Sequence, residues 1–189
     1  FYLQRIFALP ETDEVELVLI VANFEHFAGG VLRPLLIGDE AAMQSRVRTF
    51  YFFYVFVFGA LLALLVFQLA YFIRSLGGPP EWAHFWYCAL SVVLLVRLFT
   101  VQAIPYFLDP DLPQTSTKLI EYQTLYLAPL TYVAFMAAMF PREFPKLVRW
   151  PVYGLSLAMT ALATVAPVHV YTSFQDFWIF VMLVVIVYA

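Results

Sequence analysis

The chain has 189 residues, of which 63% are hydrophobic, 19% aromatic and only 12% charged, and its formal net charge is −3. Ordinary globular proteins carry about 25% charged residues, so this composition favours a membrane protein over a soluble domain. The small net charge, without a basic run, argues against a nucleic-acid partner.

Residues 1–38 have the pattern of β-strands, and their apolar runs are too short to cross a bilayer. Pro10 closes a first short apolar stretch. From Glu14 onward, apolar residues alternate onto one face until the Gly29–Gly30 pair breaks the pattern. The alternating residues are Val15, Leu17, Leu19 and Val21. We therefore expect 1–38 to form the last strands of an extracytoplasmic β-sandwich, joined by a polar connector at 39–49 to a membrane-embedded part.

The segment 50–73 has no charged residue and a single amide, Gln68. At about 1.5 Å per residue, a helix of this length reaches roughly 36 Å, more than the hydrocarbon core of about 30 Å. The segment is predicted to be a membrane span, and Gln68 is predicted to form a polar contact with a neighbouring helix. The alternative for Gln68 is contact with a ligand.

Further apolar segments make 50–189 a mainly α, polytopic helical bundle. The predicted spans are 82–104, 118–140, 150–170 and 177–189, the last one truncated. The first and third connections hold most of the loop cations (Arg74, Arg142, Lys146 and Arg149), whereas the second and fourth hold only Lys118. Positive loops remain in the cytoplasm, so the β-domain is expected on the outer side. Arg46 and Arg48 flank the first span on its outer side and oppose this orientation, but a folded domain ahead of them weakens their effect.

Two charged residues lie inside the predicted spans. Arg97 is about 22 Å along the second span, and Glu121 is in the first turn of the third, so both lie near the outer face. A charge at the bilayer centre costs at least about 2.5–3.5 kcal/mol, which favours an interhelical ion pair between them. The alternative is that Arg97 extends to the headgroups while Glu121 caps its helix in water.

Other residues give weaker indications. Glu25 and His26 have no second histidine or cysteine at ligand spacing, so we expect no metal site. The Gly59–Ala63 and Gly154–Ala158 spacings permit close helix approach, within the bundle or in a homodimer. No nucleophile–base pair or phosphate-binding loop is present, and we expect neither a cofactor nor an enzyme.

A family resemblance covers most of the chain from about Val15. The junction between strands and helices resembles the end of the jelly-roll-like outer domain in bacterial seven-transmembrane receptors with diverse intracellular signalling modules. The residues that carry the junction motif are Asn23, Phe24, His26, Gly29, Gly30 and Gly38. The segments around Arg97 and Glu121 resemble the second and third spans of that family, although Phe67–Gln68 stands where the family often has Tyr-His.

The resemblance implies a sensor in the bacterial inner membrane. Its outer domain would bind a small molecule, which would be a carbohydrate by family analogy. Seven spans would lead to a cytoplasmic output module, and about five of these spans are seen in this sequence. The alternative is a non-catalytic accessory subunit that packs with lipid and with a larger membrane complex. A transporter is least favoured, because only scattered Ser and Thr such as Ser91, Thr131 and Thr160 lie at mid-span.

Overall fold

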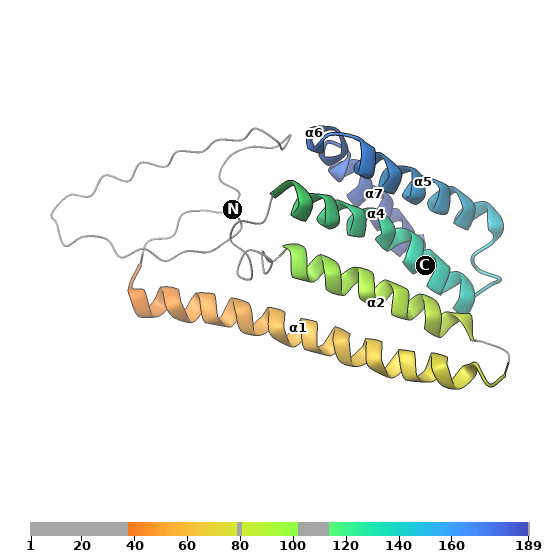
Figure 1. Ribbon diagram of the computed structural model, residues 1–189, viewed down its shortest axis with the longest axis horizontal. Helices are drawn as coiled ribbons and strands as arrows, with labels where there is room; N and C mark the ends of the chain where they lie inside the picture. Colours follow the sequence, from red (N-terminus) through yellow and green to blue (C-terminus); the bar gives the residue numbers. More distant parts are fainter. Residues whose placement is uncertain (1–37, 79–80, 102–113, 189) are drawn as a thin grey trace.

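The computed structural model describes residues 38–78, 81–101 and 114–188. Its helices are α1 (Glu40–Ser75), α2 (Trp82–Val101), α4 (Gln114–Met139), α5 (Lys146–Val165), α6 (Val168–Thr172) and α7 (Gln175–Tyr188). Figure 1 shows α1, α2, α4 and α5 side by side in chain order, with α7 behind α4. Each of these four helices therefore packs against the next one along the chain.

Helix α1 is long and lies at the edge of this layer. Asp39 caps its start, because its carboxylate accepts hydrogen bonds from the backbone N–H groups of Ala41 and Ala42. Its 36 residues extend about 54 Å, and its first turns continue past the end of α2 in Figure 1. It packs mainly against α2, and none of its residues is buried.

Helix α4 is the centre of the structure. It packs against α2, α5, α6 and α7, and most of its side chains between Tyr122 and Ala137 are buried or half-buried. Two apolar clusters surround it. One joins Tyr122, Leu125 and Tyr126 to α5, α6 and α7. The other joins Val133 and Ala137 to Phe144 and Val185.

Pro129 lies inside α4 and removes one backbone hydrogen bond. Proline has no N–H, so the carbonyl four residues earlier, that of Leu125, loses its helical partner. The indole Nε1–H of Trp178 on α7 donates to this oxygen at 2.9 Å. Trp178 is fully buried and meets Tyr126 edge-to-face, with ring centroids 5.1 Å apart. A neighbouring helix thus satisfies the backbone group that proline leaves free.

The predicted fold class is wrong for the part of the chain that the structure describes. Residues 38–78, 81–101 and 114–188 contain helices and no strand, and no β-sandwich is seen there. The strands predicted in 1–37 lie outside the described residues. The bundle was also predicted to contain about five spans, yet only α1 and α2 are long and apolar enough to cross a membrane among the described helices.

Polar residues and prolines explain the smaller number of membrane-length helices. The first five residues of α4, Gln114–Lys118, are polar, and the first turn of α5 contains Lys146 and Arg149. The predicted span 150–170 is interrupted at Pro167, between α5 and α6. Helix α7 is apolar but has only 14 residues. A bilayer needs about 20 consecutive apolar residues, and these segments do not supply them.

Replacing Trp178 by Phe should lower the free energy of unfolding by about 1–3 kcal/mol, because the Leu125 carbonyl would be buried without a donor. Replacing Pro129 by Ala restores a helical donor for the same oxygen, so the W178F loss should be smaller in a P129A background. Chemical unfolding in detergent measures all four proteins of this cycle. Equal W178F losses in both backgrounds would mean that Trp178 acts through packing alone, and W150F, at an exposed site, is the control.

Candidate functional site

A polar cluster lies where α2 meets α4. Arg97 of α2 donates from Nη1 to the backbone oxygen of Glu121 on α4 at 2.9 Å. The carboxylate of Glu121 accepts from Lys118 Nζ at 2.7 Å, and both side chains of this ion pair are largely buried. The structure therefore brings Arg97 and Glu121 together through the carbonyl, while the carboxylate pairs with Lys118.

Threonines complete the hydrogen bonding of this cluster. The hydroxyl of Thr124 donates to the carbonyls of Ile120 and Glu121, and that of Thr100 donates to Val96 and Arg97. The two positive charges and one carboxylate thus lie among backbone acceptors where α2 meets α4. Hydrogen bonds to charged groups contribute about 1.5–3 kcal/mol, so this arrangement fixes the α2–α4 contact.

A second polar contact joins α1 to α2 at the opposite end of α2. Gln68 lies with Oε1 at 2.6 Å from Nδ1 of His84, and Nε2 of His84 is 2.9 Å from a carboxylate oxygen of Glu81. Tyr71, one turn after Gln68, stacks on the imidazole with ring centroids 5.6 Å apart. His84 and Arg97 are separated by about 20 Å along α2, so the two contacts hold opposite ends of the helix.

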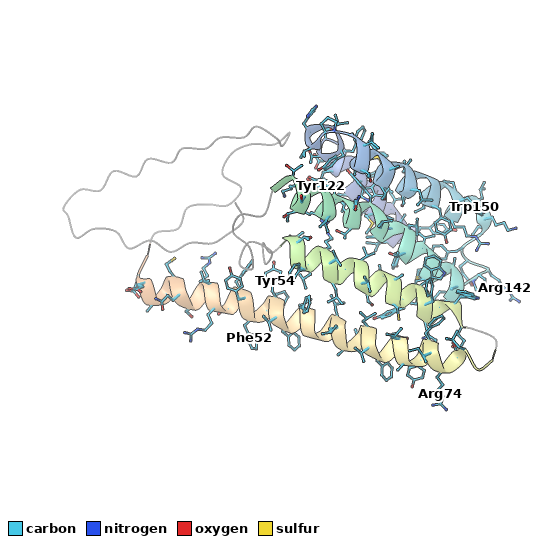
Figure 2. All side chains as sticks on the ribbon, in the orientation of Figure 1. Phe52, Tyr54, Arg74, Tyr122, Arg142 and Trp150 are labelled. Atoms are coloured by element: carbon cyan, nitrogen blue, oxygen red, sulfur yellow. The ribbon has the colours of Figure 1, made fainter. Side chains whose placement is uncertain are left out.

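Aromatic side chains fix α4 to the C-terminal helices. The hydroxyl of Tyr122 lies 2.6 Å from Oε1 of Gln175, and that of Tyr126 donates to the backbone oxygen of Tyr171. Figure 2 places Tyr122 at one end of the bundle, with Arg74, Arg142 and Trp150 at the other. The α4–α7 part is thus bound by buried hydrogen bonds as well as by apolar packing.

Most of the junction motif lies outside the described residues, namely Asn23, Phe24, His26, Gly29 and Gly30. Gly38 is described: it is exposed and immediately precedes the Asp39 cap of α1. The helical glycines Gly59 and Gly154 both face open space, so the described chain does not use them for packing. Arg97, Glu121 and Gln68 are therefore the predicted site residues for which the structure provides contacts.

Sequence reasoning missed the partners of these residues. Lys118 was assigned to a connection between spans, and no polar contact was predicted for His84 or for Trp178, which is fully buried. Gln68 and His84 lie on either side of the short connection between α1 and α2, and this placement could have predicted their contact. The Pro129 break, in turn, called for an external donor somewhere in the fold.

The described residues contain no group of three His, Cys, Asp or Glu side chains that could hold a metal ion. Cys88, a free and buried thiol, lies 4.0 Å from the Leu65 carbonyl. Both polar contacts join neighbouring helices, Arg97 to the Glu121 carbonyl and Gln68 to His84, and this geometry suits helix positioning. No protein-family model matches the chain, and neither the curated proteins nor the solved structures contain a match to it.

Replacing Arg97 by Gln should reduce the free energy of unfolding by about 1–3 kcal/mol, because the charge-assisted bond to the Glu121 carbonyl is lost. R74Q removes the same charge from an exposed position and should change stability by less than about 0.5 kcal/mol. Unfolding in detergent compares the two variants. Equal effects would show that Arg97 does not hold α2 against α4.

Proposed function

We propose that α1 and α2 cross a bacterial inner membrane as a helical hairpin and that the chain is part of a membrane sensor. The support is that α1 and α2 are long and apolar enough to cross a bilayer and that the exposed side of α1 is apolar. Large side chains such as Phe52, Phe56 and Val66 are each more than 60% exposed on it. Such a surface is costly in water and favourable in hydrocarbon.

One observation carries the sensor proposal: α1 is continuous from Glu40 to Ser75 and none of its residues is buried. A helix attached mainly to one neighbour can shift or rotate as a rigid body at less cost than a helix enclosed by several. Helix α4, enclosed by four neighbours, provides the fixed frame. In this proposal α1 relays a change from the segment before Gly38 to the bundle.

The proposed direction of signalling follows from charge. Arg74 and Arg142 lie at the same end of the structure in Figure 2, together with Trp150, a residue type common at membrane interfaces. We assign this end to the cytoplasm by the positive-inside rule. A small-molecule ligand, a carbohydrate by analogy with seven-transmembrane receptors, would then act from the outer side, and an output module would act in the cytoplasm.

The accessory-subunit function remains the second candidate, and one observation favours it. The exposed side of α1 has a shallow apolar groove lined by Gly59, Leu62, Ala63, Val66, Phe67 and Ala70. Small residues permit close approach of another helix, so a partner protein in the same membrane could pack there. In that case α1 would be a fixed contact and not a moving element.

The denatured and native masses of the intact protein, extracted from its own membrane in mild detergent, separate the two functions. A sensor should have a denatured mass well above 21.7 kDa, with soluble cytoplasmic sequence in the same polypeptide. An accessory subunit should have no such output sequence and should elute in a stable complex with other proteins. The second result would overturn the sensor proposal.

Replacing Leu62 by Arg tests the membrane assignment directly. Leu62 is exposed near the middle of the apolar part of α1, where a charge costs about 2.5–3.5 kcal/mol on insertion. The variant should therefore insert poorly, as measured by carbonate extraction of membranes. Q44R adds the same side chain in the first turns of α1, outside the predicted span, and should insert normally. Normal insertion of L62R would place this face of α1 in water.

A further inference from the structure

Helix α1 has two stripes of side chains on opposite sides. One stripe is half-buried and faces α2, where Gln68 meets His84. Ala70 lies two residues after Gln68, about 200° further around the helix, and belongs to the second stripe, which is exposed. We call this second stripe the outer stripe, and its residues are Phe52, Phe56, Gly59, Ala63, Val66 and Ala70.

The spacing of the outer stripe is that of a helix that packs along another helix. Its members follow one another at intervals of four and three residues in strict alternation, and Thr49 and Ile73, both exposed, continue this spacing at the two ends. A mean spacing of about 3.5 residues keeps one stripe in contact with a neighbour when two helices supercoil in the left-handed sense. The period therefore extends from Thr49 to Ile73, over most of the apolar part of α1.

The middle of the outer stripe is a groove. Gly59, Ala63 and Ala70 form its floor together with the larger side chains that line it. A Cβ atom added at Gly59 would meet no other atom within 4 Å, so nothing in the described chain fills this space. In Figure 1, α1 lies at the edge of the layer with α2 on its inner side. Small residues allow the backbone of another helix to approach closely, and the described helices supply no such partner here.

A second copy of the chain fits this groove best. The loop charges give every copy the same orientation in the membrane, so two adjacent α1 helices run parallel and at the same depth. A two-fold axis between them places each stripe residue opposite the same residue of the other copy. Gly59 and Ala63 then meet small residues at their own depth, which permits the closest approach. The charged residues Arg48 and Arg74 lie beyond the ends of the outer stripe, so its pairing brings no like charges together.

We propose that the outer stripe is a homodimer interface in which the α1 helices of two copies pack in parallel. This inference rests on the proposed membrane crossing of α1, because the bilayer imposes the common orientation. A contact about 36 Å long and about 10 Å wide covers roughly 360 Å² on each copy. Stable complexes in water bury about 800 Å² per partner. The dimer should therefore be reversible and should depend on the close approach at Gly59 and Ala63.

The dimer joins two copies through the helix that is proposed to relay the signal. A shift or rotation of α1 in one copy changes which side chains it presents to the α1 of the other copy. The two copies should therefore respond together, and a ligand that moves α1 should also change the strength of their association.

The first test is a cysteine scan of α1 in membranes that contain the intact protein. Single cysteines are introduced in a C88A background and oxidised, and the disulfide-linked dimer is measured. A63C and A70C should cross-link strongly. The matched controls are L64C and L69C, because each of these exposed positions is adjacent to a stripe position but lies about 100° away from it around the helix. Equal cross-linking at all four positions would indicate random collision and would overturn the proposal.

The second test fills the groove. G59L should weaken the association by about tenfold or more, because the leucine side chain holds the two backbones apart. G154L is the matched control: Gly154 is also an exposed helical glycine, and a Cβ there also meets no atom within 4 Å. G154L should leave the association unchanged. Energy transfer between donor-labelled and acceptor-labelled copies of the purified protein in phospholipid vesicles, at a series of protein-to-lipid ratios, measures both variants.

A protein that stays monomeric at every protein-to-lipid ratio would overturn the proposal, and lipid or a different protein would then cover the outer stripe. Unchanged association of G59L would also contradict it, because another surface would join the copies. Failure of the dimer and failure of the proposed function are distinguishable. Normal insertion of L62R removes the membrane crossing itself, whereas a monomeric protein whose L62R variant inserts poorly rejects the dimer alone.

Discussion

The backbone oxygen of Leu125 constrains the centre of this structure. Pro129 deprives it of its helical partner, and a buried carbonyl without a donor costs about 1–3 kcal/mol. The indole of Trp178 supplies the donor, which fixes α7 against α4 at one position along its length. Tyr126 packs on that indole and donates to Tyr171, so the short α6 is fixed by the same group of residues. The α4–α7 arrangement thus depends on one proline and its external partner.

Helices α2 and α1 are attached in a different way. Arg97 binds a backbone oxygen of α4 and anchors one end of α2, whereas Gln68 and His84 join the other end to α1. Between these contacts, apolar packing is less directional and does not fix the position of a helix along its axis. Because α1 has no buried residue and its polar attachment to α2 is near its C-terminal end, movement should be easiest in its first turns. This difference between a fixed α4 and a loosely attached α1 is the physical basis of the proposed relay.

Local sequence patterns indicated apolar helices, but the number of membrane-length helices that they predicted was wrong for the described residues. In an apolar run without charge, such as 50–73, a helix satisfies all backbone hydrogen bonds within the segment. Helix α1 includes that run without a break. The run 150–170 appeared equally continuous, yet Pro167 ends the helical geometry and α5 and α6 are separate. The β-sandwich was inferred from alternation in 1–38, but the described chain contains helices and no strand.

By itself, the sequence determined where apolar helices form, because hydrophobicity and helix breakers act within one segment. It also singled out Arg97, Glu121 and Gln68, since polar groups in apolar helices are costly without partners. Only the tertiary structure decided which atoms meet them: Arg97 binds a carbonyl of Glu121, Lys118 takes the carboxylate, and His84 meets Gln68. Those choices depend on how far each helix is shifted and rotated against its neighbour. Contacts between residues distant in sequence set these shifts and rotations, so a local sequence pattern cannot predict them.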